Sequence, residues 1–157
     1  MRRFSRIFAW TTLFFVAGAV LFFTKAAALP YKVAWPVLLL SLATFLSRRR
    51  ELLPFGFAFL FSAAGDAVGA RGLFIPQMAF FALAHVAYVC WFLPRARRRL
   101  RAVSLAVTVP LLVFLFAAIV PEAPFPAERI GVAVYGLVIA AMLYSALQYD
   151  GACAAGF

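Results

Sequence analysis

Six long apolar runs, separated by short breaks rich in Arg, Gly and Pro, constrain the fold of this chain more than any other feature. Hydrophobic residues make up 67% of the chain and charged residues only 13%, which is far outside the range of soluble globular domains. A transmembrane helix needs about 20 predominantly apolar residues, and each run comes near that length. We therefore predict an all-α integral membrane protein with about six transmembrane helices in a single polytopic domain, residues 1–157. The expected spans are 7–23, 31–47, 52–70, 73–93, 102–120 and 130–149.

The first two runs fit a membrane span less well than the others. A segment with three arginines, residues 2–6, precedes the first run and Ala26–Ala28 follow it, which is also the pattern of a cleaved secretory signal peptide. We favour a retained helix, because the run is long for a signal core and just long enough for a span. The second run crosses the membrane only if the long side chains of Tyr31 and Lys32 reach the interface.

The basic residues fall mostly on one side of the predicted membrane. With six crossings, the side of the N-terminus receives eleven of the fifteen Lys and Arg residues, which leaves four for the opposite side. This asymmetry predicts a cytoplasmic N-terminus in a multi-pass protein of the cytoplasmic (inner) or plasma membrane. The net charge of +10 has the same origin, and since no nucleic-acid-binding motif accompanies it, we expect no nucleic-acid partner. The eleven are Arg2, Arg3, Arg6, Arg48, Arg49, Arg50, Arg95, Arg97, Arg98, Arg99 and Arg101, and the four are Lys25, Lys32, Arg71 and Arg129.

The two cysteines give no sign of a metal site. Cys90 and Cys153 lie far apart, with neither CxxC spacing nor a histidine placed to complete a ligand set. We interpret both as small packing residues. We therefore expect no metal and no other cofactor.

Two ionisable residues lie well inside predicted spans: Asp66 in the third run and His85, the only histidine, in the fourth. Such a side chain at membrane depth costs about 2.5–3.5 kcal/mol on insertion scales, which makes it a candidate functional residue. At about 1.5 Å per residue, Asp66 lies roughly 6 Å and His85 roughly 18 Å inside the outer boundary. On straight helices, direct contact between the two side chains would need helix tilt or a bridging water.

Four further polar residues are candidates to support this pair. One of them, Ser62, lies one helical turn before Asp66, and Gln77 lies at the depth of Asp66 on the returning helix. Tyr88 lies one turn after His85 on the same stripe as Gln77, and the fourth residue lies at intermediate depth in the sixth run. The pattern predicts a polar cavity that opens to the outer leaflet, with His85 and Tyr88 at its floor. The four residues are Ser62, Gln77, Tyr88 and Tyr135.

Each polar residue also has a purely structural interpretation. Asp66 would then cap its helix or pair with Lys32 or Arg71 near the interface. His85 would be a neutral core histidine that hydrogen-bonds to Tyr88 or to a carbonyl group. The remaining hydroxyl and amide groups would satisfy one another, as buried polar groups commonly do.

Three motifs carry a resemblance to a known family. They are LFSAAGDAVGA (residues 60–70), FIPQMAFFALAHVAY (residues 74–88) and VYGLVIAAML (residues 134–143). From about Lys32 onward, the chain resembles the YhhN or lysoplasmalogenase family of multi-span membrane proteins. The resemblance implies hydrolysis of the vinyl ether bond of a lysoplasmalogen to a fatty aldehyde and a glycerophospho-alcohol. It also implies a lysophospholipid substrate taken from the surrounding membrane lipids.

The implied reaction agrees with the residue types. Vinyl ether cleavage needs a proton delivered to an alkene carbon, and then water added to the carbon that becomes oxocarbenium-like. Asp66 is the candidate catalytic acid, and His85 is the candidate activator of water or partner of Asp66. The runner-up is a non-catalytic membrane protein that binds or transports a small amphiphile, and a purely structural helix bundle is a third interpretation.

The resemblance also implies features beyond those seen in this sequence. Members of the family are expected to have about eight spans and a second acidic motif, Ser-Asp, in the seventh. This sequence reaches Phe157 after six runs, and its other acids lie in loops or at the ends of runs. We therefore expect a truncated or degenerate member whose activity depends on whether one embedded acid suffices.

Overall fold

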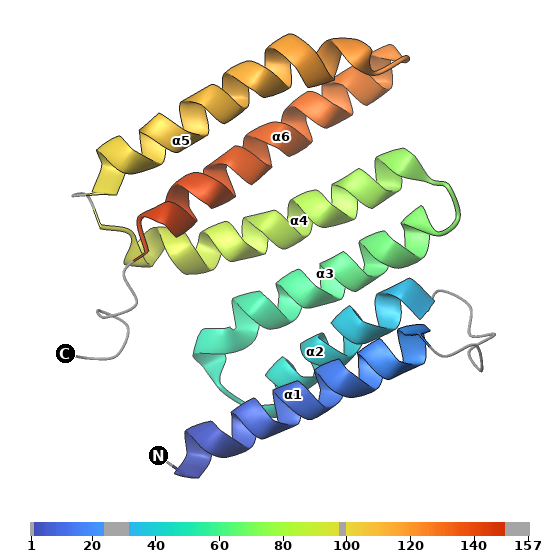
Figure 1. Cartoon of the computed structure of the whole chain (residues 1–157), viewed down its shortest axis with the longest axis vertical. Helices are drawn as coiled ribbons and strands as arrows, with labels where there is room; N and C mark the ends of the chain where they lie inside the picture. Colours follow the sequence, from blue (N-terminus) through green and yellow to red (C-terminus); the bar gives the residue numbers. More distant parts are fainter. Residues whose placement is uncertain (1, 24–31, 98–99, 150–157) are drawn as a thin grey trace. The chain divides into compact units, whose positions relative to one another are not determined.

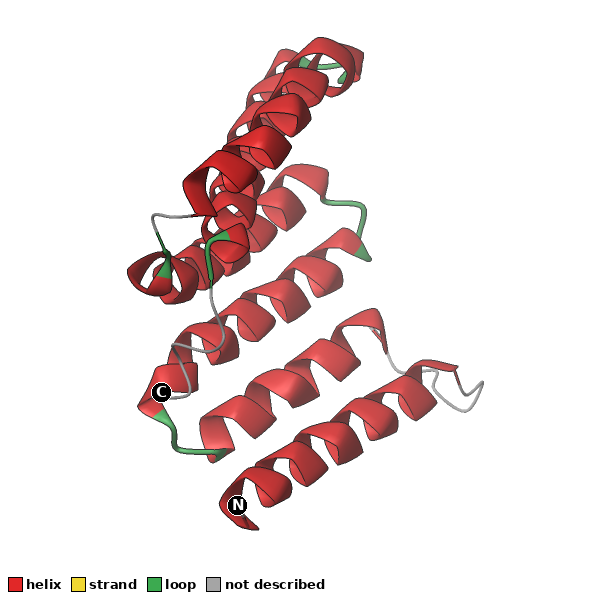
Figure 2. Cartoon of the chain, turned by 60° about the vertical axis from the view of Figure 1, so that its left-hand side comes forward, coloured by secondary structure: helices red, strands yellow, loops and turns green. Residues whose placement is uncertain are grey.

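A computed structural model describes residues 2–23, 32–97 and 100–149, and every regular element in these ranges is helical (Figures 1 and 2). The prediction of an all-α fold is therefore confirmed. The six α-helices are α1 (Arg2–Phe23), α2 (Trp35–Leu46), α3 (Leu53–Gly69), α4 (Phe74–Phe92), α5 (Arg101–Phe114) and α6 (Pro126–Leu147). Short 3-10 helices are η1 (Lys32–Ala34), η2 (Arg50–Leu52), η3 (Leu93–Arg95) and η6 (Val120–Glu122), and η5 (Leu115–Ile119) is a π-helical turn.

Four helical stretches in the described ranges are long and apolar enough to cross a membrane: Arg50–Gly69, Phe74–Arg95, Arg101–Glu122 and Pro126–Leu147. They hold 20 to 22 residues each, so each is about 30–33 Å long, which matches the hydrocarbon core of a bilayer. These stretches agree with the last four predicted spans. The crossings by residues 7–23 and 31–47 stay predictions, as do the cytoplasmic N-terminus and the single domain; α2 alone has 12 residues.

The start of α6 differs from the expectation. The three prolines between residues 121 and 129 predict a loop that ends near Ile130, but α6 already begins at Pro126. Proline is tolerated in the first turn of a helix, where its missing N–H needs no partner. The Arg129 Nε donates to the carbonyl oxygen of Ala123 at 2.8 Å, which ties the first turn of α6 to the remaining loop.

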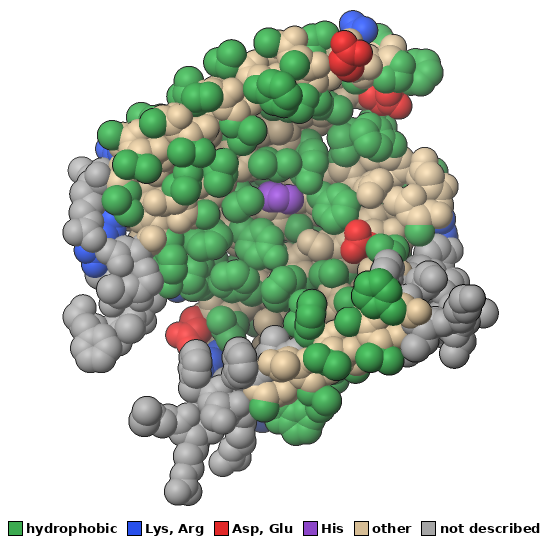
Figure 3. Space-filling model, in the orientation of Figure 1, with side chains coloured by type: hydrophobic (Ala, Val, Ile, Leu, Met, Phe, Trp, Pro, Cys, Tyr) green, Lys and Arg blue, Asp and Glu red, His purple; other side chains and the backbone are tan. Residues whose placement is uncertain are grey.

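Small side chains are buried between the helices and many large apolar side chains are exposed, which is the opposite of the distribution in a water-soluble protein. Ser41, Ser104 and Ser145 are at most 1% exposed, whereas Val113 and Ile130 are more than 60% exposed. Hydrophobic side chains cover much of the molecular face in Figure 3. Small residues between helices and large apolar residues outside are typical of helices packed within lipid, so this distribution supports an integral membrane protein.

The described chain divides into two compact units, residues 1–84 and 85–157, and the boundary lies within α4. In the first unit, α2 packs against both α1 and α3. A Cβ atom on Gly18 of α1 would lie only 2.6 Å from Cα of Pro36, so these two backbones approach closely. The Ser41 hydroxyl donates to the carbonyl oxygen of Gly56 in α3 at 2.8 Å. Glycines therefore set the spacing of these helices.

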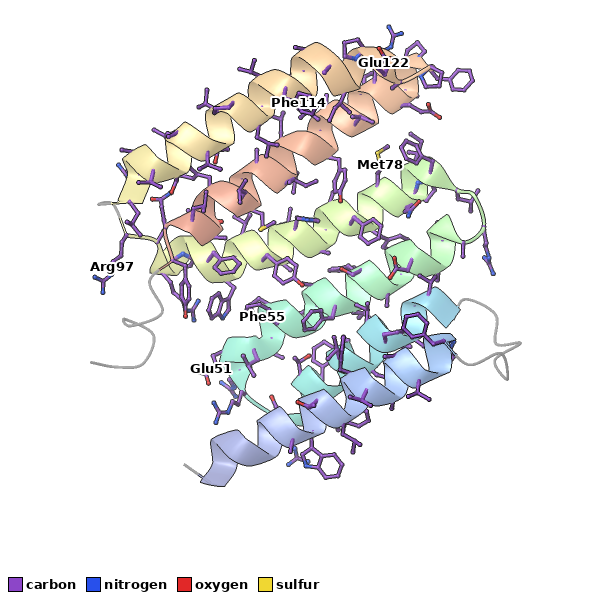
Figure 4. The ribbon with its side chains drawn as sticks, in the orientation of Figure 1. Glu51, Phe55, Met78, Arg97, Phe114 and Glu122 are labelled. Atoms are coloured by element: carbon purple, nitrogen blue, oxygen red, sulfur yellow. The ribbon has the colours of Figure 1, made fainter. Side chains whose placement is uncertain are left out.

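In the second unit, α5 and α6 form an antiparallel pair, and Figure 4 shows Arg97 and Glu122 at opposite ends of it. The end of α6 is fixed to the connection after α4, because the Arg97 N–H donates to the carbonyl oxygen of Gln148 at 2.9 Å. Near this connection, the ring centroids of Trp91 and Tyr149 lie 5.0 Å apart. The charged residues of the two helices thus lie near the ends of the pair.

Candidate functional site

Asp66 lies three residues before the end of α3 and is half-buried. Its carbonyl oxygen accepts the N–H of Ala70 at 3.0 Å, as expected near the end of a helix. Among the described residues, no ion pair and no hydrogen bond to its carboxylate is found, so the alternative of pairing with Arg71 is not supported. The side chain of Lys32, the other proposed partner, lies outside the described part of the structure.

Two glycines beside Asp66 let α4 approach α3 closely. A Cβ atom on Gly65 would lie 3.3 Å from the ring of Phe81, and one on Gly69 would collide with the side-chain amide of Gln77. Gln77 therefore packs on α3 at the level of Asp66, as the depths in the sequence predict. Ser62 lies one turn before Asp66 on α3 and is also half-buried. The first unit thus brings three of the six candidate residues to one region.

The other three candidates meet in the second unit. His85 lies edge-to-face against Tyr88, with ring centroids 6.3 Å apart, and against Tyr135 of α6, with ring centroids 5.6 Å apart. All three side chains are half-buried. The sequence placed His85 and Tyr88 on one stripe, but it gave no sign that Tyr135 touches the imidazole. The two tyrosine rings limit the orientations that the imidazole can adopt. A single cavity that joins Asp66 to His85 stays a prediction.

A cavity that the sequence interpretation missed lies in the first unit. It has a volume of about 340 Å³, and its lining is apolar. The signal that could have revealed it is a stripe of small residues on α3 at a helical spacing, opposite the start of α2. The lining residues are Ala34, Trp35 and Leu38 on one side and Leu60, Ala63, Ala64 and Ala67 on the other.

Metal ligands are not clustered in the described ranges, where no group of three or more His, Cys, Asp and Glu side chains is found. Cys90 is an exposed free thiol. Cys153 lies outside the described residues. The ionisable groups among the candidate residues are a carboxyl group in the first unit and, in the second, an imidazole and two phenolic hydroxyls.

Comparisons with known proteins identify the family. No curated protein and no solved structure is significantly similar to this sequence. A family model, that of the YhhN family, matches residues 27–156. Because this match covers most of the sequence and includes both Asp66 and His85, the chain belongs to the YhhN family.

Proposed function

We propose that this protein is a lysoplasmalogenase, which hydrolyses the vinyl ether bond of a lysoplasmalogen to a fatty aldehyde and a glycerophospho-alcohol. The family to which the chain belongs includes lysoplasmalogenases. The observation that carries the proposal is Asp66: a carboxyl group without a polar partner among the described residues, in a helix long enough to cross a membrane. An acid at membrane depth is costly, so its presence there is by default a sign of function.

Asp66 would act as the catalytic acid. In its protonated form it delivers a proton to the vinyl carbon further from the ether oxygen, and an oxocarbenium ion forms at the other vinyl carbon. Water adds to that carbon, a base accepts the proton that the water loses, and the carboxylate is reprotonated before the next turnover. The hemiacetal that results collapses into the aldehyde and the free alcohol, so the net reaction consumes one water molecule.

His85 is proposed separately as the group that activates the water. An imidazole can accept a proton near neutral pH, which makes histidine the most common general base in enzymes. The rings of Tyr88 and Tyr135 would hold the imidazole in one orientation. Ser62 and Gln77, in the region of Asp66, would contact the polar part of the lysophospholipid.

The proposal is tested by aldehyde release from a lysoplasmalogen in detergent, with the purified protein and its Asp66→Asn variant. We expect release by the unaltered protein and at least a 100-fold lower rate for the variant, since general acid catalysis contributes about 10²–10⁴-fold. Glu51→Gln is the control, because Glu51 is an exposed acid in an ion pair with Arg49 at 3.4 Å. Equal rates for Asp66→Asn and the unaltered protein would contradict the proposal.

The apolar cavity favours a second candidate, a non-catalytic protein that binds or moves a single-chain amphiphile. The same variant separates the two functions. An enzyme would lose turnover in Asp66→Asn and keep lipid binding, whereas a carrier would bind lipid without releasing aldehyde in either form.

A further inference from the structure

The cavity in the first unit has the size and lining of a hydrocarbon site. Alanine and leucine side chains of α3 form one wall, and Trp35 and Leu38 of α2 form the other. At about 30 Å³ for a group the size of a water molecule, 340 Å³ holds about eleven such groups, and a methylene group is of similar size. A linear chain of ten or more carbons would therefore fill it, and apart from the indole N–H of Trp35 the lining side chains have no polar group that could lose hydration.

An arginine, Arg71, lies just beyond the lining residues of α3, on the side of the helix that faces the cavity. Leu60, Ala64 and Ala67 recur at steps of four and three residues, which places them on one helical stripe. Arg71 lies four residues after Ala67, and its N–H donates to the carbonyl oxygen of Val68 at 3.0 Å, so a tight turn of 3-10 type follows α3 as far as this residue. Arg71 is exposed at the turn that ends α3. An apolar cavity that ends beneath an arginine is complementary to a hydrocarbon chain that ends in a phosphate.

We propose that the cavity between α2 and α3 binds the hydrocarbon chain of a single-chain phospholipid, with the phosphate near Arg71. Asp66 lies five residues before Arg71, about 7.5 Å along the helix axis. In a lysoplasmalogen, six covalent bonds separate the vinyl carbon bound to oxygen from the phosphorus atom, about 7–8 Å when extended. A chain in the cavity would therefore place its ether group at the level of Asp66. The choice of this lipid, though not the chain site itself, rests on the proposed function.

Trp35 provides a direct probe of the cavity. In a protein whose Trp10 and Trp91 are replaced by phenylalanine, Trp35 is the only tryptophan. The probe ligand is a lysophosphatidylcholine with a saturated ether-linked chain that carries a spin label, because it cannot be hydrolysed. We expect saturable quenching of Trp35 fluorescence in detergent, and also in the Asp66→Asn background.

Filling the cavity should abolish this binding. Ala64→Phe in α3 and Leu38→Trp in α2, with Trp35 retained, add bulk from opposite walls, so the two variants test the site independently. For Ala64→Phe, we expect at least a tenfold higher Kd for the spin-labelled lipid. For Leu38→Trp, the readout is displacement of a radiolabelled form of the lipid. Ala79→Phe, at an exposed position of α4 outside the lining, is the matched control.

The role of the phosphate is tested with a second ligand. Arg71→Gln should raise the Kd of the lysophospholipid about tenfold and leave the Kd of a spin-labelled fatty alcohol unchanged. Saturable quenching without aldehyde release would support the chain site and contradict the proposed function. Aldehyde release without quenching of Trp35, or equal binding by Ala64→Phe and Ala79→Phe, would overturn the chain site.

Discussion

The two units differ in whether their polar side chains find partners within the unit. In the first unit, the Asp66 carboxyl group has no polar partner among the described residues, and an apolar cavity adjoins the same helix. In the second unit, His85 lies against two tyrosine rings, and the Ser104 and Ser145 hydroxyls donate to carbonyl groups of their own helices at 3.0 and 2.9 Å. With Thr108 as the exception, the described polar groups of the second unit thus make contacts within that unit. In the first unit, the Asp66 carboxyl group has no such contact, and we propose that it acts on a ligand.

The largest expected effect tests this contrast directly. Asp66→Asn should lower turnover at least about 100-fold and leave the thermal midpoint unchanged or slightly raised, since a negative charge near the end of a helix is unfavourable by about 0.3–1 kcal/mol. His85→Phe should lower turnover about tenfold and also lower the midpoint. Both quantities are measured on the purified proteins in detergent. A large loss of stability in Asp66→Asn would mean that Asp66 has a structural partner, and the contrast would fail.

Helix spacing provides the next test. Gly18→Ala places a methyl group against the backbone of Pro36, which cannot move aside, so we expect a loss of about 1–3 kcal/mol in stability. Gly136→Ala meets only the end of the Leu115 side chain, which can rotate, and gains helix propensity of about 1 kcal/mol. Its net effect should be near zero. Thermal midpoints of the two variants in the same detergent check the order, and a reversed order would refute this account of the spacing.

The ring contacts of His85 should have a smaller effect. Edge-to-face aromatic pairs contribute about 0.5–1.5 kcal/mol, so Tyr135→Leu should lower stability by about 1 kcal/mol and turnover about threefold to tenfold. Tyr135→Phe keeps the ring and should restore both. If Tyr135→Phe were as damaging as Tyr135→Leu, the hydroxyl group would have a role of its own, and the second unit would also present a polar group to the ligand.

The smallest effect is expected at Thr108 in α5. Its hydroxyl oxygen is buried without a hydrogen-bond partner among the described residues, which makes it the exception within the second unit. Thr108→Val removes this unsatisfied group at nearly constant shape, so stability should stay equal or rise by up to about 1 kcal/mol. Ser104→Ala, which removes a hydroxyl that does donate, is the control and should lower the midpoint. A lower midpoint for Thr108→Val would show that Thr108 has a partner.

The sequence predicted the positions of residues along the helices better than the contacts between helices. Breaks at Gly72 and at the arginines after residue 94 marked the ends of α4 closely, because such residues interrupt apolar runs. Pro126 was assigned to a loop, since a proline fits both a loop and a first helical turn. The contact of His85 with Tyr135 depends on the rotation of two helices about their axes, which the apolar pattern of these helices leaves open. The cavity depends on helix spacing, so composition alone did not reveal it.

The burial of small side chains and the exposure of large ones have a consequence for redesign. Helix contacts depend on residues such as Gly18 and Ser41, whereas Leu46, Val113 and Ile130 face outward and are 62–67% exposed. The residues that hold the helices together are therefore largely different from the outward-facing apolar residues that suit a lipid environment. Replacing the outward leucines, valines and isoleucines with charged and amide side chains would leave the helix contacts in place, so the design of a water-soluble form could leave its interior sequence unchanged.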